Sequence, residues 1–174
     1  MFGEGPERAT VVLVGEQPGD AEDRSGHPFV GPAGGILDRA LVEAGLSRRE
    51  VYLTNAVKHF KWEPRGKRRI HVKPRISEVK ACRPWLEEEL SRLRPRVIVC
   101  LGTTAVQSLL GRGITISSAK ERVFDTHFGP VVVTRHPSSV LRAREEDERL
   151  AAYQELLHDL RRARTVASTD VSEP

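Results

Sequence analysis

Four short apolar runs constrain the fold of this 174-residue chain more than any other feature of its sequence. They cover residues 9–14, 51–53, 97–101 and 131–134, and longer segments with helical spacing separate them. A short apolar run followed by glycine or polar residues is typical of a strand that is buried on both faces of a parallel sheet. The sequence therefore predicts a three-layer α/β/α domain around a central, mainly parallel four-stranded sheet.

The segments between and after these runs carry the apolar stripes of amphipathic helices. We expect helices over residues 33–44, 76–93 and 145–164, the second of them kinked or restarted at Pro84. Residues 111–128 show no clear periodicity, and we interpret them as a connecting loop.

The length of the chain suits one domain, which we expect over residues 1–164. Residues 165–174 are rich in Ser, Thr, Asp and Glu without apolar periodicity, which predicts a disordered tail. No apolar run approaches the roughly 18 to 20 residues that a membrane span needs. We therefore expect a cytoplasmic, monomeric protein that has no membrane partner.

Basic residues concentrate in the segment 58–75. Eight Lys or Arg residues there face one acid, Glu63, so the segment carries a formal charge of +7 in a chain of +4 overall. A local basic patch suits docking to a polyanion, and Phe60 and Trp62 among the cations suit single-stranded nucleic acid better than a membrane surface. The alternative is a solvated loop whose charges only keep the protein soluble.

Polar residues follow the first two apolar runs. Glu16, Gln17 and Asp20 stand among glycines and proline at the carboxyl end of the first run, which is where open α/β sheets bind ligands. In the next loop, Phe29 is either a stacking platform for a flat heterocycle or an ordinary core residue. Asn55 follows the second run, and its amide can read a pyrimidine edge or simply form a turn.

A third polar cluster follows the fourth run and contains His136 beside hydroxyl and guanidinium groups. Because the carboxyl ends of parallel strands meet at one edge of a sheet, we expect the three clusters to converge there.

Four of these stretches, taken in order, resemble the motif series of the uracil-DNA glycosylase superfamily, and most closely its iron–sulfur family-4 enzymes. They are Gly15-Glu16-Gln17-Pro18-Gly19-Asp20, Gly26-His27-Pro28-Phe29-Val30-Gly31, Thr54-Asn55 and His136-Pro137-Ser138-Ser139. The insertion Lys67-Arg68-Arg69-Ile70-His71 resembles the UdgX branch, whose members form a covalent complex with uracil-containing DNA. The similarity spans nearly the whole chain.

The resemblance implies a role for each matched position. Phe29 would stack on the flipped uracil, Asn55 would read its pyrimidine edge, and His136 would donate a hydrogen bond to uracil O2. The uracil-binding residues would be Gly15, Gln17, Phe29, Asn55 and His136. The catalytic residues would be Glu16, Asp20, His71 and His136. The residues that grip DNA would be Lys67, Arg68, Arg69, Ser138, Ser139 and Arg142.

The resemblance also implies that His71 captures the sugar by bonding to C1′ after the glycosidic bond breaks. A neutral imidazole held near the oxocarbenium-like sugar is a better nucleophile than water, and it leaves that carbon poorly. Base flipping costs less in an open strand than in a duplex, so we expect single-stranded uracil-containing DNA to be preferred.

The cysteines depart from the family pattern. Relatives hold a [4Fe–4S] cluster on four cysteines, whereas this chain has only Cys82 and Cys100, which could be core thiols or two of the ligands. We expect that the true start lies upstream and adds a Cys-x-x-Cys pair that completes the cluster. The rival interpretation is that this member has lost the cluster and keeps both cysteines in its core.

Two other functions stay open. The chain could be an ordinary turnover glycosylase whose basic insertion only grips DNA, or a non-catalytic module that binds uracil-containing or single-stranded DNA. A generic nucleotide-binding domain is disfavoured, because neither Gly-x-Gly-x-x-Gly nor a P-loop lysine motif follows the first apolar run.

Overall fold

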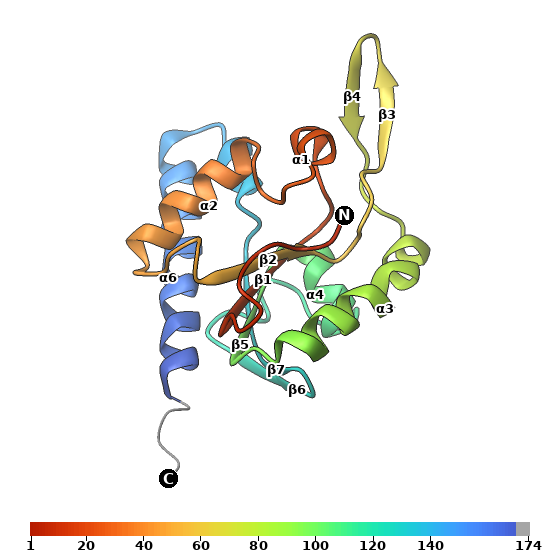
Figure 1. The fold of residues 1–174 in the computed structure, drawn as a ribbon. Helices are drawn as coiled ribbons and strands as arrows, with labels where there is room; N and C mark the ends of the chain where they lie inside the picture. The colour runs from red at the N-terminus through yellow and green to blue at the C-terminus, as the bar shows by residue number, and fades with distance from the viewer. Residues whose placement is uncertain (170–174) are drawn as a thin grey trace.

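A five-stranded sheet forms the centre of the structure, a computed structural model that describes residues 1–169 (Figure 1). Its strands are β1 (Val11–Gly15), β2 (Val51–Asn55), β5 (Val97–Leu101), β6 (Val123–Thr126) and β7 (Gly129–Thr134). They lie in the order β2-β1-β5-β7-β6, and every neighbouring pair is parallel except β6 with β7. The predicted α/β class and the mainly parallel sheet are confirmed.

Helices cover both faces of this sheet. Helices α2 (Pro32–Glu43) and α6 (Glu146–Thr169) lie on one face, and α3 (Ile76–Leu93) and α4 (Thr103–Leu109) lie on the other (Figure 1). Successive side chains of a strand point to opposite faces, and β1 divides its apolar residues accordingly. Val11 and Leu13 belong to the core with α2 and α6, whereas Val12 and Val14 belong to the core with α3 and α4.

The main sheet and its helices differ from the prediction in several details. The sheet has five strands rather than four, because β6 lies in the segment 111–128 that we had interpreted as a loop. This edge strand is short and only partly buried, so its apolar signal is weak. Helix α3 is continuous across Pro84, which lies on its exposed side, so it does not restart there. Helix α6 reaches Thr169, so the predicted tail is helical over residues 165–169, and its remainder lies outside the described residues.

The basic segment contains a second, separate sheet that was not predicted. Strands β3 (Trp62–Arg65) and β4 (Arg68–His71) form an antiparallel ribbon that projects from the carboxyl edge of the main sheet (Figure 1). Its turn carries Gly66 at a φ of 60°, the conformation that the first central residue of a type II′ hairpin turn requires.

Two short helices, α1 (Asp20–Ser25) and α5 (Ser138–Arg142), lie in the polar stretches that follow β1 and β7. The chain therefore brings the ends of β1, β2, β5 and β7, both short helices and the ribbon to one edge of the sheet. No helix within residues 1–169 is long and apolar enough to span a bilayer.

Candidate active site

A cavity of about 640 Å³ opens at the carboxyl edge of the main sheet. It lies between the neighbouring strands β1 and β5, whose following helices α2 and α4 pack on opposite faces of the sheet. Open α/β sheets bind ligands at this position. The predicted residues that line it are Glu16, Gln17, Phe29, Asn55, His71, His136, Ser138, Ser139 and Arg142. The expected convergence of the three polar clusters is therefore present, with the ribbon's His71 added to them.

Glu16 and His71 meet at this cavity. Atom Nε2 of the half-exposed His71 lies 3.1 Å from Oε1 of Glu16. Burial raises the pKa of Glu16, but the contacts with His71 and with the hydroxyl of Thr104 outweigh it and hold that pKa below its ordinary value. Glu16 is therefore a carboxylate at neutral pH, able to accept a proton or a hydrogen bond from the imidazole.

Thr104 was not among the predicted site residues. Its hydroxyl donates to Oε2 of Glu16, so the two oxygens of that carboxylate have different partners. Thr104 lies in the first turn of α4, directly after β5, whereas Glu16 directly follows β1. Gly102-Thr103-Thr104 directly follows the predicted strand 97–101, as the other polar clusters follow theirs. The same reasoning therefore identifies Thr104 as a residue at the ligand-binding edge.

Phe29 and Asn55 form one wall of the cavity. Phe29 is only 6% exposed and belongs to the core, yet its ring also lines the cavity and lies 6.2 Å from the His136 ring at an interplanar angle of 28°. Phe29 is therefore a core residue whose ring also reaches the cavity, and its stacking on a base stays a prediction. Gly15 lies against these two side chains, because a Cβ there would sit 2.7 Å from Cζ of Phe29 and would also collide with Oδ1 of Asn55.

His136 has a fixed hydrogen-bonding pattern. Its Nδ1 accepts the backbone N–H of Ser138 at 3.1 Å and lies 2.8 Å from the Ser138 hydroxyl. Burial lowers the pKa of His136 to about 4, so the ring is neutral at physiological pH. A neutral ring that accepts at Nδ1 carries its proton on Nε2, which leaves Nε2–H as a donor.

The two serines serve local structure. The Ser138 hydroxyl also accepts a hydrogen bond from Arg142, and the Ser139 hydroxyl donates to the backbone carbonyl of His136. These contacts order the loop that carries His136. Of Ser138, Ser139 and Arg142, only Arg142 is exposed, so its guanidinium is accessible to a phosphate.

A buried ion pair behind Asn55 was also missed. Lys58 and Glu89 are both nearly inaccessible to solvent, and the Lys58 ammonium contacts the Glu89 carboxylate. The same ammonium donates a hydrogen bond to the backbone carbonyl of Asn55 at 2.8 Å. Burial lowers the pKa of Lys58 despite the attraction of Glu89. The pair joins the end of β2 to α3. Its two members lie so far apart in the sequence that their contact could not be predicted from it.

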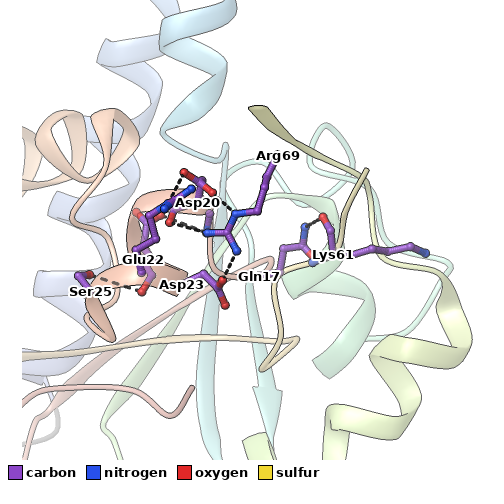
Figure 2. A network of polar contacts seen from close by, with 9 residues as sticks. Gln17, Asp20, Glu22, Asp23, Ser25, Lys61 and Arg69 are labelled. Atoms are coloured by element: carbon purple, nitrogen blue, oxygen red, sulfur yellow. Dashed lines mark hydrogen bonds and ion pairs between the residues drawn. The ribbon is translucent and has the colours of Figure 1, made fainter. Parts of the chain in front are cut away.

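Two predicted site residues are engaged elsewhere. Asp20 is absent from the cavity lining, and its carboxylate accepts a hydrogen bond from Arg24. It also accepts one from Arg69, as Figure 2 shows. Gln17 lines the cavity, but its side-chain amide is bonded to the backbone of Lys61 and Val72 at the base of the ribbon. Hydrogen bonding of Gln17 to the base would therefore have to come from its backbone.

The adjacent arginines of the ribbon have different environments. The guanidinium of Arg69 is paired with Asp20 and Asp23 in this structure, and its contact with DNA stays a prediction. Lys67 and Arg68 are exposed at the turn and on the other face of the ribbon, where they are accessible to a polyanion.

The two cysteines do not fit a four-thiolate cluster. Cys82 packs with Val57 and Val79 beside α3, whereas Cys100 lies in the middle of β5 in a different hydrophobic cluster. Burial raises the pKa of Cys100 to about 12, which disfavours the thiolate that iron binds. Within residues 1–169, no group of three or more His, Cys, Asp or Glu side chains is arranged to hold a metal ion. Cys82 and Cys100 therefore do not form a metal site together in this structure, and their role as cluster ligands stays a prediction.

Comparisons with known proteins point in one direction. The family model described as the Uracil DNA glycosylase superfamily matches residues 2–161. A protein named type-4 uracil-DNA glycosylase from Archaeoglobus fulgidus is 40% identical over 157 residues, covering 84% of this chain and 75% of the relative. One of the same name from Thermotoga maritima is 36% identical over 158 residues, covering 90% and 79%. A type-5 uracil-DNA glycosylase from Thermus thermophilus is 37% identical over 123 residues, covering 62% and 52%.

Proposed function

This chain belongs to the uracil DNA glycosylase superfamily. We propose that it excises uracil from DNA and that His71 then forms a covalent bond with C1′ of the abasic sugar. The observation that carries the proposal is the approach of His71 Nε2 to Glu16 Oε1, 3.1 Å, at the cavity that also holds Phe29 and Asn55. The type-4 names of the relatives support uracil excision, and the ribbon histidine supports capture.

Excision begins with recognition of a flipped base. The Asn55 amide offers two donors and an acceptor to the edge of uracil, and the Phe29 ring offers a flat apolar surface for stacking. Both side chains lie so close to Gly15 that a residue with a side chain at position 15 would displace them.

The C1′–N1 bond then breaks, and its electron pair leaves with uracil. Negative charge spreads onto uracil O2. There, neutral His136 can donate a hydrogen bond from its Nε2–H while the proton stays on the ring. The ionised Glu16 carboxylate stabilises the positive charge that develops on the sugar.

Capture follows on the same face. The ring nitrogen of His71 that does not face Glu16 donates its lone pair to C1′, and a new C–N bond forms. The positive charge passes to the imidazole, which loses its other proton to the Glu16 carboxylate and becomes a neutral, substituted ring. Water would complete an ordinary hydrolysis at this point, so the proposal requires that His71 reaches C1′ first.

The substrate that fits best is uracil in a single strand, bound by a monomer. Flipping is cheapest in an unpaired strand, and the exposed cations Lys67, Arg68 and Arg142 can hold its backbone without reading its sequence. A turnover glycosylase is the second candidate, because the printed names of the relatives describe glycosylases.

A denaturing gel tests the proposal. The protein is mixed with an end-labelled single-stranded oligonucleotide containing one uracil, and samples are heated in detergent before electrophoresis. We expect a retarded, heat-resistant band with the wild type and with His127→Ser, an exposed histidine at the β6–β7 turn. His71→Ser should release uracil without forming the band. Uracil release by the wild type without a band would establish turnover instead.

A further inference from the structure

We propose that Arg48 is a positioning residue, which holds the Phe29 ring at the cavity by selecting one of two conformations open to the Pro28-Phe29 turn. The inference deepens the proposed function, because it rests on the stacking of Phe29 on the flipped uracil. Arg48 itself lies outside the cavity lining and outside the stretches that resemble the family motifs.

The backbone of Phe29 has an unusual conformation. Its φ is 53°, in the left-handed region that residues other than glycine rarely adopt. Pro28 and Phe29 are the central residues of a turn. A positive φ at the second central residue is characteristic of a type II turn, in which glycine normally occupies that position. Backbone strain of this kind persists only where surrounding contacts hold it, and it concentrates at functional sites.

The proline before Phe29 leaves two turn types open. Proline at the first central position suits both type I and type II turns, which differ by a flip of the peptide group between the two central residues. In a type I turn the φ of Phe29 would be about −90°, without the strain. The flip would tilt the Cα–Cβ bond of Phe29 and displace the ring at its end. The direction of the Pro28 carbonyl therefore decides where the ring lies.

Arg48 bonds to both carbonyls of this turn. Its Nη2 donates to the carbonyl of Pro28 at 2.6 Å, and its Nη1 donates to that of Phe29 at 3.1 Å. Nη1 also lies 2.7 Å from Oδ1 of Asp38 in α2, which orients the guanidinium. A planar group with donors in fixed directions can bond two neighbouring carbonyls at once. A flipped peptide would turn the Pro28 carbonyl away from it.

The Phe29 carbonyl and ring are closely packed as well. A Cβ at Gly34 would lie 1.8 Å from the Phe29 carbonyl oxygen, so the first turn of α2 contacts this carbonyl directly. The ring lies against Gly15 and faces the His136 ring across 6.2 Å. The conformation that Arg48 selects is therefore the one that places the ring in the wall of the cavity.

Loss of Arg48 should not unfold the protein. The side chains of Arg48 and Asp38 are 33% and 44% exposed, so water can solvate the charge and the carbonyls that a substitution leaves unpaired. Variants of Arg48 can therefore be compared with the wild type as folded proteins.

The test measures recognition of uracil without its excision. The probe is single-stranded DNA with one 2′-fluoro-2′-deoxyuridine, whose fluorine opposes positive charge at C1′ and so slows breakage of the glycosidic bond. The same strand with cytosine at that position is the reference, and the ratio of the two dissociation constants gives the uracil preference. We expect Arg48→Met to lower this preference about 10-fold, as loss of stacking on one aromatic ring would, without weakening binding of the cytosine strand.

Two further variants define the cause. Arg48→Lys should fall between Arg48→Met and the wild type, because an ammonium cannot hold both carbonyls in the same forked way. Arg49→Met is the matched control, since it makes the same change at an exposed neighbour in the same loop, and it should keep the wild-type preference. An equal loss of preference in Arg49→Met would overturn the proposal.

Phe29→Leu tests whether Arg48 acts through the ring. In this background Arg48→Met should cause little further loss of preference, because both changes remove one interaction. A further loss of about 10-fold there would show that Arg48 acts elsewhere. A merely structural role predicts a lower melting temperature for Arg48→Met with an unchanged uracil preference, and that result would also overturn the proposal.

The test separates this inference from the proposed function. If the wild type shows no uracil preference, the proposed function fails and the role of Arg48 fails with it. If the preference is present and depends on Arg48, the positioning role stands even where no covalent product forms, because the probe measures binding before any bond breaks. If the preference is present but independent of Arg48, only the positioning role fails.

Discussion

Glu16 is the residue on which the proposed chemistry converges, and Thr104 holds one of its two oxygens. We expect Thr104→Val to slow capture about 10-fold, because a hydrogen bond to a charged group contributes about 1.5–3 kcal/mol. The loss would also raise the pKa of Glu16, so the acidic limb of the pH–rate profile should move to higher pH. Thr104→Ser should restore both properties. A Thr104→Val profile that coincides with the wild type would show that Thr104 does not act through Glu16.

His136 makes a prediction about stability. Its pKa is lowered from 6.5 to about 4 in the folded protein, so the unfolded chain binds its proton at a higher pH than the folded chain does. The stability that the neutral ring contributes is present above pH 6.5 and is lost as the pH falls toward 4. The free energy of unfolding should therefore fall by roughly 1 kcal/mol per pH unit in this window because of His136 alone. Denaturant titrations of the wild type and His136→Asn at several pH values isolate this contribution, and parallel curves would refute it.

Single residues were predicted with uneven success, for a physical reason. Asn55 ends β2, His136 lies two residues after β7, and Phe29 lies in a turn of the loop between β1 and α2. Strand assignment alone therefore brings such residues to one edge. The difference between Arg68 and Arg69 depends on which face of a ribbon each occupies, and no strand was predicted in that segment. The side chain of Gln17 was assigned to uracil because nothing in the sequence indicates where the ribbon leaves the domain.

Among the helices and strands, the end of β2 depends on a buried ion pair. Glu89 of α3 accepts hydrogen bonds from the Gly3 backbone and from Thr54 in addition to its pairing with Lys58. Removing one partner leaves an uncompensated buried charge, so Glu89→Ala should lower the free energy of unfolding by about 3–5 kcal/mol. Glu88→Ala, an exposed neighbour in the same helix, is the control and should change it by less than about 0.5 kcal/mol. Equal effects of the two substitutions would contradict the importance of the pair.

The long elements could be predicted because their periodicity is strong. The buried strands β1, β5 and β7 and the helices α2, α3 and α6 all show their pattern in the sequence. The elements that were missed are short or exposed, namely α1, α5, β6 and the ribbon. Such elements are stabilised by side-chain contacts with distant parts of the chain, and these contacts have no local signature.

Across the molecule, the fold separates recognition from capture. The main domain supplies the cavity with Phe29, Asn55 and His136, while the ribbon brings His71 to its rim from a segment that contributes nothing to the core. Sequence reasoning could predict the α/β architecture and the shared edge, since both follow from parallel strands. It could not predict that the basic segment is an ordered arm held against α1.

The burst of uracil release tests this division of labour most directly. With single-stranded uracil DNA in large excess, free uracil and covalent product are measured over time in the same samples. The proposed function predicts that release stops at one uracil per protein molecule, with the protein fully attached to DNA, and that His71→Ser continues to release uracil beyond that point. Steady release by the wild type over many equivalents, without attached protein, would contradict capture by His71.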